Sequence, residues 1–498
     1  MTPSDEFKRR IDAAKRSRSE VEPDIRDVFR YCAPGREKDF NSTIRDGEDP
    51  ENFHSLGEEL AGDLASDLVT YYTPDEARWA ELEITVPVAE EDEEAVLAEL
   101  EGRERTLFDL IEQSNWSDVA LPLMFEASTH GTPAVWIDQA HLTEPVRFTV
   151  VPPHELLITP GHLGYLDRFR ETTVHVSTLP ALFASDPGVT FGRELREKIE
   201  KKKGTAKVCW GFWLDWSDPG NPQWAREIVV DEKRVTKEGE IVGPMAGSCP
   251  LHVGRFSPWP SRVWGRGPGR KALPDLRMVD KIDETLISNM DQALMRTIIY
   301  ANDGFLDMSE GIEAGRAYPA GRGFNAREHI HEFPSGTNID MGWFTEERIE
   351  QRLRAAFFQD GPRQRGDTPP SATQWLDERR RVQQRLGKPA APLWTEFFYP
   401  ILQRVEQLGV AAGKLPQAIL YNGQTIHVRP MSPLQKAQDQ DKVVIARSNL
   451  DLAAQVFGEG TAEVIDPRAT FRNVVKASGD ELTVIRAEEP QTAKAPVA

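Results

Sequence analysis

The sequence predicts an α+β fold, because helical and strand-like hydrophobic patterns occupy separate stretches of the chain. Leucines recur at every fourth position from Leu56 to Leu68, which is the spacing of one helix face. Between residues 132 and 256, short runs of β-branched and aromatic residues alternate with Pro and Gly, as in antiparallel strands. Long helical patterns return beyond residue 274. We therefore expect a mainly helical N-terminal part, a β-rich part and a third part built on long helices.

The composition allows a folded core but argues against a protein that coats nucleic acid. Of 498 residues, 39% are hydrophobic and 28% are charged, and the length suggests roughly three domains. The chain has 60 Lys and Arg against 80 Asp and Glu, so its formal net charge is −20. Binding along a nucleic acid requires surplus cations to neutralise phosphates. This charge still permits a protein past which DNA slides without being held.

Cysteine usage and the N-terminal sequence predict a soluble protein made inside a cell. Cys32, Cys209 and Cys249 are widely spaced and odd in number, so we expect buried thiols rather than disulfides or a zinc site. The first twenty residues lack the apolar run of a signal peptide. The longest apolar stretches are far shorter than the roughly 20 residues needed to span a bilayer.

The first third of the chain is predicted to be mainly helical. One helical face runs through residues 7–28, and we expect an interruption near Pro23. The leucine-rich helix must stop before Pro74, because a residue that precedes proline avoids the helical conformation. Residues 90–101 are rich in carboxylates and are interpreted as the solvated face of another helix. Ser117 can cap a further helix.

The β-rich part is expected to contain several short strands and one charged helix. Strands are expected at residues 133–137, 148–151, 156–159, 207–216, 228–230 and 251–256. The helix is expected at about residues 193–203. Four tryptophans occur here, at Trp210, Trp213, Trp216 and Trp224. Clustered tryptophans can form a sugar-binding platform, but we favour packing in the core.

A boundary of glycines and cations lies at residues 264–271, before the long helices. We expect Pro274 to open the first of them, because its fixed φ suits the first turn. A Gly-rich insertion of strands and turns follows to about residue 340, and a second helix is expected at about residues 345–359. This order places a compact β insertion between two long helices. It predicts a stalk of two helices that carries a small β-containing head at its tip.

The remaining chain begins with a loop of Gly, Pro and polar residues at 361–370. Ser371 can cap a helix that ends at Gly387, and residues 393–408 form the next helical pattern. A strand at 426–428, a helix from Ser432 to about residue 457 and a helix after residue 466 complete the order.

The sequence offers no anchor for catalysis. It contains no P-loop, no His-Glu-x-x-His and no Gly-x-Ser-x-Gly pattern, and pairs of carboxylates are expected by chance among 80 acids. The glycines and cations at 264–271 precede a helix, as in an anion site, but their spacing does not match a dinucleotide-binding loop. We favour a structural turn there, with an anion site as the alternative. We expect no enzyme activity, no cofactor and no metal.

Three short segments carry the most distinctive patterns. At residues 71–79 a helix ends in Tyr-Tyr-Thr-Pro and a Trp-containing strand follows. At residues 264–276, Trp-Gly-Arg-Gly-Pro is followed by Ala-Leu-Pro-Asp-Leu. At residues 430–434, Pro-Met-Ser-Pro-Leu precedes a helix. The second segment resembles the Tyr-Gly-Arg-Gly-Pro and Ala-Leu-Pro-Asp signature that opens the stem helix of portal (head-to-tail connector) proteins of short-tailed bacteriophages. The other two are similar to that family in their order along the chain.

The resemblance implies the portal-protein fold: a mainly helical wing, a two-helix stem, a small β-containing clip and a helical crown, assembled as a ring. The parts it implies are the wing at 1–273 and 371–431, the stem at 274–297 and 343–360, the clip at 298–342, the channel (tunnel) loop at 361–370, the crown at 432–487 and a disordered tail at 488–498.

The resemblance also implies a function without covalent chemistry. Twelve subunits would form a ring at one capsid vertex, through which double-stranded DNA is packaged by the terminase, retained and ejected. The tail adaptor, tail proteins, major capsid protein and scaffolding protein would be its other partners, and no membrane would be involved. The protein would be made in the cytoplasm of the host bacterium and reside at the head-tail junction of the virion.

Three groups of residues follow from the resemblance as candidate sites. Rings of channel-loop side chains would touch phosphates transiently, with an ordinary exposed loop as the alternative; these are Arg363, Gln364 and Arg365. Clip residues would face DNA, terminase or adaptor; these are Arg316, Arg322 and Arg327. The motif that opens the stem comprises Gly265, Arg266, Gly267, Pro268, Pro274 and Asp275. Twelve copies at −20 each would carry 12 × −20 = −240, so that acidic walls repel phosphates and sparse arginines grip them.

Two other classes of protein remain open. The 12 tryptophans and many carboxylates suggest a carbohydrate-active hydrolase as one alternative. A structural or scaffolding protein that assembles without a channel is the other. Particles with a central hole would favour the portal over both.

Overall fold

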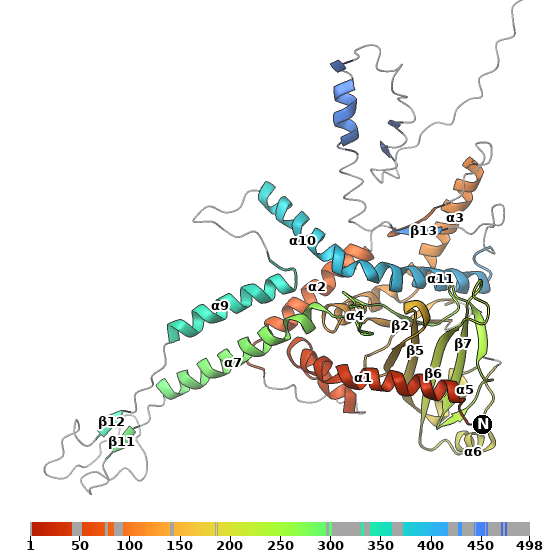
Figure 1. The fold of residues 1–498 in the computed structure, drawn as a ribbon, viewed down its shortest axis with the longest axis horizontal. Helices are drawn as coiled ribbons and strands as arrows, with labels where there is room; N and C mark the ends of the chain where they lie inside the picture. The colour runs from red at the N-terminus through yellow and green to blue at the C-terminus, as the bar shows by residue number, and fades with distance from the viewer. Residues whose placement is uncertain are drawn as a thin grey trace, which may run out of the picture. The chain divides into compact units, whose positions relative to one another are not determined.

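The computed structural model describes most of the chain as two compact units (Figure 1). The larger unit comprises Met1–Pro23, Gly62–Gly267 and Gly361–Ala498, and the smaller comprises Asp24–Ala61 and Pro268–Asp360. The described residues are 2–41, 52–74, 78–83, 93–139, 144–184, 186, 188–294, 298–300, 330–332, 339–360, 372–416, 427–430, 443, 445–453, 455–456, 470–471 and 474–475.

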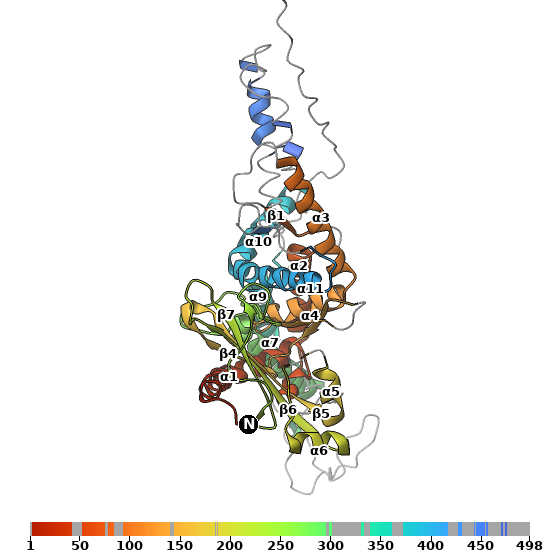
Figure 2. The same cartoon turned by 90° about the vertical axis from the view of Figure 1, so that its right-hand side faces the viewer.

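An antiparallel sheet of six strands forms the centre of the larger unit. Its order is β4-β5-β6-β7-β8, and β9 also pairs with β7. The bounds are β4 Leu156–Pro160, β5 Leu166–His175, β6 Thr205–Asp215, β7 Gln223–Val230, β8 Lys233–Arg234 and β9 Glu240–Pro244. Helices α5 (Leu179–Leu182) and α6 (Arg193–Lys201) lie in the connection between β5 and β6, at one end of the sheet (Figures 1 and 2). The predicted β-rich part, with its one charged helix, is confirmed.

Two smaller sheets complete the β structure of this unit. One has the order β10-β2-β3, with β10 at Leu251–Val253, β2 at Ala134–Asp138 and β3 at Arg147–Val150. The other pairs β1 (Ala80–Glu83) with β13 (His427–Pro430), antiparallel. The strand predicted near residue 427 is confirmed, and it joins segments far apart in the sequence.

The first half of helix α1 (Asp5–Cys32) packs on the six-stranded sheet. Phe7, Ile11 and Ala14 share one buried cluster with Phe169 of β5. The rings of Phe7 and Phe169 lie edge to face, with centroids 5.7 Å apart. A Cβ atom at Gly211 would come within 2.7 Å of both rings, so glycine at this point of β6 makes room for the helix.

Helices and aromatic side chains form the second core of the larger unit. The helices are α2 (Leu56–Tyr72, whose first turns belong to the smaller unit), α3 (Glu93–Glu112), α4 (Trp116–Ser128), α10 (Ala372–Leu393) and α11 (Tyr399–Ala411), with a π-helical turn at Trp394–Phe398. Trp79 is 4% exposed, and its ring meets those of Phe108, Trp394 and Phe398 at centroid distances of 5.5, 6.1 and 5.8 Å. Trp79 thus lies directly before β1 and not within the strand that the sequence predicted to contain it, and its buried ring joins α3 to the π-helical turn.

Two of the predicted helix boundaries are wrong. Helix α1 runs without interruption through Pro23. Helix α10 continues through Gly387, Pro389 and Pro392 and merges with α11 through the π-helical turn. The local cost of these helix breakers is outweighed by packing, since the side chains of Ala390, Leu393, Phe397 and Phe398 are fully buried.

The predicted start of the long helix is also wrong. Helix α7 spans Pro268–Leu294, so Pro274 lies inside it. Pro268 occupies its first position, where a missing N–H costs nothing. The hydrogen bond lost at Pro274 is offset by burial of the neighbouring Leu273 and Leu276, which are 6% and 2% exposed.

The smaller unit contains α7, the hairpin β11–β12 and α9 (Ile339–Ala356). Strands β11 (Ile298–Tyr300) and β12 (Ile330–Glu332) are antiparallel. The predicted order of helix, β insertion and helix is confirmed. The second half of α1, the 3-10 helix at Arg36–Asn41 and the first turns of α2 belong to the same unit.

Several other sequence expectations can be compared with the structure. The three cysteines are buried and unpaired. Trp210, Trp213 and Trp224 are 3–6% exposed, which confirms core packing for these three. Trp216 is half-buried, and its ring contacts those of His162 and Tyr165. Among the described residues, no helix has the length and apolar character needed to cross a bilayer. The loop at 361–370, most of the helix expected from Ser432, and the tail at 488–498 lie outside the described residues.

Candidate functional site

Three glycines bring two backbone segments of the larger unit into direct contact. Gly131 follows α4 and has φ +91°, a conformation that side chains rarely adopt. A Cβ atom added at Gly131 would lie 2.1 Å from the Gly267 nitrogen, and one added at Gly265 would lie 1.9 Å from the Gly131 oxygen. A Cβ atom at Gly267 would lie 2.4 Å from the Thr129 oxygen. The glycines of the stem-opening motif are therefore required by close backbone packing.

Hydrogen bonds between the same two segments occupy the backbone amides of the motif. Gly265 donates to the Thr132 hydroxyl at 3.0 Å, and Gly267 donates to the His130 carbonyl at 3.2 Å. Arg266 donates to the Phe256 carbonyl at 2.7 Å. An anion-binding loop needs free amides that point at the ligand. These three amides point at protein oxygens, so the geometry supports the structural turn and not the alternative anion site.

The side chains of the motif make separate contacts within each unit. In the larger unit, the Arg266 guanidinium lies 4.7 Å from the Trp259 ring centroid, and the Trp264 indole donates to the Ser17 hydroxyl at 3.2 Å. In the smaller unit, Asp275 of α7 forms an ion pair with Arg352 of α9, with 2.8 Å between Oδ1 and Nη2. Arg270 and Arg277 of α7 pair with Asp24 and Asp27 of α1.

Apolar residues at helical spacing pack α7 against its neighbours in the smaller unit. Leu276 and Val279 of α7 and Ile349 and Leu353 of α9 are each no more than 2% exposed. A Cβ atom at Gly57 of α2 would lie 2.9 Å from a Leu276 methyl group. The two long helices are therefore joined by a narrow apolar seam.

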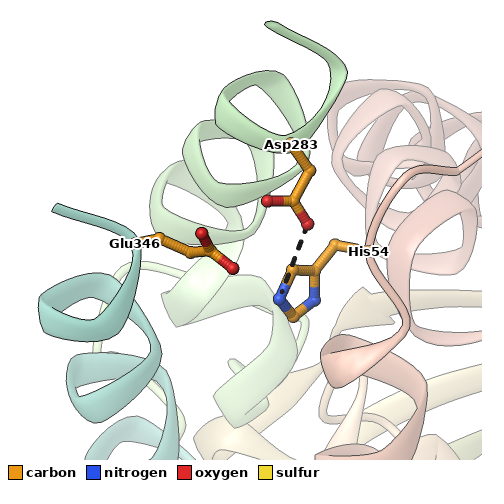
Figure 3. A group of neighbouring side chains, drawn as sticks. All are labelled: His54, Asp283 and Glu346. Atoms are coloured by element: carbon orange, nitrogen blue, oxygen red, sulfur yellow. Dashed lines mark ion pairs between the residues drawn. The ribbon is translucent and has the colours of Figure 1, made fainter. Parts of the chain in front are cut away.

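A polar cluster lies beside this seam (Figure 3). His54 precedes α2, Asp283 is on α7 and Glu346 is on α9, and the three side chains point toward one another. The His54 Nε2 atom lies 3.3 Å from Glu350 Oε1 and 3.9 Å from Asp283. Ligand atoms of His54, Asp283 and Glu346 all lie within 4.8 Å of one another, so these residues are the ones described that could hold a metal ion.

The hydrogen bonding of His54 disfavours a metal ion in this arrangement. Its Nδ1 atom accepts from the Leu56 amide at 3.0 Å, so the ring proton is on Nε2, which faces the carboxylates. A metal on Nε2 would move that proton to Nδ1, where it would meet the Leu56 N–H. The cluster is better described as a histidine that donates to Glu350 of α9, with the carboxylate of Asp283 of α7 at 3.9 Å.

Crowding of the carboxylates changes their acidity. The pKa of Glu346 is raised, first by burial and then by the negative charges of Asp283 and Glu350. The pKa of Asp283 is also raised, first by burial, with the proximity of His54 opposing and Asp280 and Glu350 adding to the rise. The folded smaller unit therefore disfavours the ionised forms of these two acids.

The structure places only part of the predicted site. All six residues of the stem-opening motif are described, and Gly265, Arg266 and Gly267 lie together at the glycine contact. The channel-loop residues Arg363, Gln364 and Arg365 and the clip residues Arg316, Arg322 and Arg327 lie outside the described residues. Sequence reasoning missed Gly131 as a partner of the motif, because the two segments are far apart in the sequence. It also missed the His54 cluster, whose members are far apart in the sequence.

We predict that Gly131→Ala destabilises the larger unit strongly. The new methyl group would meet the Gly267 nitrogen in an unfavourable backbone conformation, so the free energy of unfolding should fall by about 3 kcal/mol or more. Gly62→Ala in α2 is the control, since a Cβ atom there has no neighbour within 4 Å, and it should stabilise by about 0.5–1 kcal/mol. Denaturant unfolding followed by tryptophan fluorescence measures both. Equal effects of the two variants would contradict the close packing.

We predict that Glu346→Gln raises the melting temperature at pH 7. When folding raises the pKa of an acid, the protein loses stability as the pH rises from the ordinary pKa of that acid to its raised pKa. Removing the charge of Glu346 should therefore raise the melting temperature at pH 7 and change it little below pH 4.5, the ordinary pKa of a glutamate. The exposed Glu347→Gln is the matched control and should change the melting temperature little at either pH. A gain at pH 4 as large as the gain at pH 7 would show that the charge is not responsible.

Comparison with known proteins gives one family assignment. The sequence model described as "Bacteriophage head to tail connecting protein" matches residues 4–485. No curated protein matches the sequence.

Solved structures of gene transfer agent (GTA) particles are also similar to the chain. A chain of the virion of the native particle has a TM-score of 0.34 and 13% identity, and the match covers 69% of this chain and 79% of that one. A chain of the neck of the empty particle, computed with C6 symmetry, has a TM-score of 0.36 and 13% identity, and the match covers 78% of this chain and 86% of that one. A chain of the neck of the native particle, computed with C12 symmetry, has a TM-score of 0.36 and 12% identity, and the match covers 83% of this chain and 93% of that one. These TM-scores do not establish a shared fold, so the assignment rests on the match over residues 4–485: the chain belongs to the bacteriophage head-to-tail connecting protein family.

Proposed function

We propose that the chain is a portal protein that forms a ring-shaped channel for double-stranded DNA at one capsid vertex. The observation that carries this proposal is the family match, which extends over residues 4–485 and leaves only short ends outside. The resemblance of residues 264–276 to the stem-opening signature of portal proteins points to the same conclusion. In this function the protein guides DNA inward, retains it and releases it without breaking a covalent bond.

The proposed parts of the portal follow the elements of the chain. Helices α7 and α9 would form the stem, and the hairpin β11–β12 would belong to the clip. The larger unit would contain most of the wing and, at residues 432–487, the crown, while wing residues 24–61 and 268–273 belong to the smaller unit. The order of helix, hairpin and helix supports this division, because a stem must leave and return around the clip.

The proposed partners follow from this position. Twelve copies would form the ring, the terminase would supply ATP-driven packaging, and the tail adaptor and tail proteins would attach at the clip. The major capsid and scaffolding proteins would contact the wing. Assembly in the host cytoplasm would place the ring in the virion at the head-tail junction.

Charge is the physical basis of the proposed DNA handling. In a ring of chains that each carry a net charge of −20, acidic walls would repel phosphates, so DNA would move without sticking. Arg363 and Arg365 in the channel loop would interrupt this field with rings of cations. Each contact with a phosphate would be transient and weakened by salt. Gln364 would add a hydrogen-bond donor to the same ring, and the clip arginines would meet DNA, terminase or adaptor.

The carbohydrate-active hydrolase is not favoured. This alternative was suggested by the 12 tryptophans and the many carboxylates. Three of the tryptophans of the β-rich part lie in the core, with exposures of 3–6%. An assembly without a channel remains the alternative that the experiments below must exclude.

We predict that replacing Arg363 and Arg365 together with Ala leaves ring assembly intact but impairs DNA packaging or retention. Two cations are lost from every subunit of the ring, so the yield of filled particles should fall by about tenfold or more. The double variant Arg193→Ala with Arg196→Ala is the matched control, because it removes the same charge from the exposed face of α6. Filled particles are counted by electron microscopy and their DNA is quantified. Normal packaging and retention in the channel-loop variant would remove the proposed role of these arginines.

A further inference from the structure

The larger unit encloses a cavity that the proposed channel function does not use. Its volume is about 860 Å³, within the range of small-molecule binding sites. Strands β5, β7 and β10, the turn at residues 163–166 and the π-helical turn with the start of α11 surround it. Its floor and walls are described residues of one compact unit.

A buried cation that forms no ion pair among the described residues lines this cavity; its favourable neighbours are Cys249 and the more distant carboxylate of Glu396. Arg168 of β5 is 8% exposed, yet it takes part in none of the ion pairs among the described residues. Its Nη1 group donates to the Leu251 carbonyl at 2.8 Å, and its guanidinium lies 5.1 Å from the Trp224 ring centroid. Its Nε atom is buried and has no hydrogen-bond partner. Other internal arginines of this unit are paired: Arg170 with Glu155, and Arg255 with Glu396.

A buried histidine beside Arg168 makes no hydrogen bond of ordinary geometry, and the Cys249 backbone is the polar group that acts on it most directly. His252 of β10 is 2% exposed, and neither ring nitrogen has a hydrogen-bond partner. Its pKa is lowered well below the usual range, first by burial and then by the positive charges of Arg168 and Arg404. The imidazole is therefore neutral and keeps one N–H to donate. Leaving such groups unpaired inside a protein costs stability unless a ligand or water satisfies them.

The walls of the cavity are apolar and aromatic. Trp224, Trp394 and Tyr399 line it, and Tyr165 stands at its opening together with Leu163. Leu163 is 73% exposed in a left-handed backbone conformation with φ 54°, so this turn presents an apolar side chain to solvent. Glu396 at the rim is held by Arg255 through two hydrogen bonds of 2.8 and 2.6 Å. The acid nearest to the cavity is thus already engaged.

We propose that this cavity binds a carboxylate attached to an apolar or aromatic body. The carboxylate would take the unpaired charge of Arg168 and a hydrogen bond from His252, and the body would lie against Trp224, Trp394 and Tyr399. One cation and one neutral donor match a singly charged carboxylate better than a phosphate, which carries more charge and needs more donors. The carboxylate belongs either to a small diffusible acid or to an acidic side chain of a neighbouring subunit.

The test uses the full-length protein and two probes that differ only in charge. Indole-3-acetate carries the carboxylate, and indole-3-acetamide is its neutral counterpart. Binding is followed by saturation-transfer NMR and titrated by calorimetry. We expect the acetate to bind, and we expect the affinity of the acetamide to be lower by about tenfold or more. Absence of acetate binding by both the assembled and the unassembled protein, or equal binding of the two probes, would overturn the proposal.

Variants locate the binding in the cavity. Arg168→Met should weaken acetate binding by about tenfold or more, whereas Arg170→Met, which removes a paired arginine two residues along the same strand, should not. If Arg168→Met does not fold, Ala246→Trp at the rim blocks the opening and leaves Arg168 in place. Unchanged binding in the folded Arg168 or Ala246 variant would contradict the assignment.

Comparison of assembled and unassembled protein identifies the source of the carboxylate. Equal acetate binding in both forms supports a diffusible acid. Binding only by unassembled chains supports an acidic side chain from a neighbouring subunit, which would fill the cavity on assembly. If neither the assembled nor the unassembled protein binds the acetate, both sources are refuted.

Discussion

The larger unit depends on the contact of backbone with backbone at Gly131, Gly265 and Gly267. There the turn after α4 meets the segment that precedes α7, with no side chain between them. The amides of this segment are bonded to protein oxygens, so a side chain at any of the three positions would both collide and open hydrogen bonds. The most distinctive sequence motif of the chain is thus explained by packing at the point where the chain passes from one unit to the other.

Charge is used in three different ways along the chain. Carboxylates of α7 and α9 are crowded around His54, where burial and like charge raise the pKa of Asp283 and Glu346. Arg168 is a buried cation beside a cavity with apolar walls, and it forms no ion pair among the described residues. In the proposed channel, an acidic background lets sparse arginines act on DNA. A net charge of −20 therefore argues against tight binding to DNA, while transient contact fits a conduit.

The sequence predicted the classes of element better than their ends and contacts. The β-rich part, the helix–hairpin–helix order and the buried tryptophans were predictable from hydrophobic period and residue type. Helix boundaries at Pro23, Pro274 and Gly387 were wrong, because tertiary burial outweighs local helix breaking. The glycine contact, the His54 cluster and the unpaired Arg168 were not predictable, since each joins residues far apart in the chain. The channel-loop and clip residues stay predictions from the family resemblance.

The central claim is that the chain assembles into a closed ring around a channel. The most direct measurement is the mass and shape of the purified particle, by native mass spectrometry and negative-stain electron microscopy. Twelve copies of the 56.0-kDa chain predict 12 × 56.0 = 672 kDa, and images should show rings with a central hole. A monomeric mass, or assembled particles without a central hole, would contradict the proposed portal function.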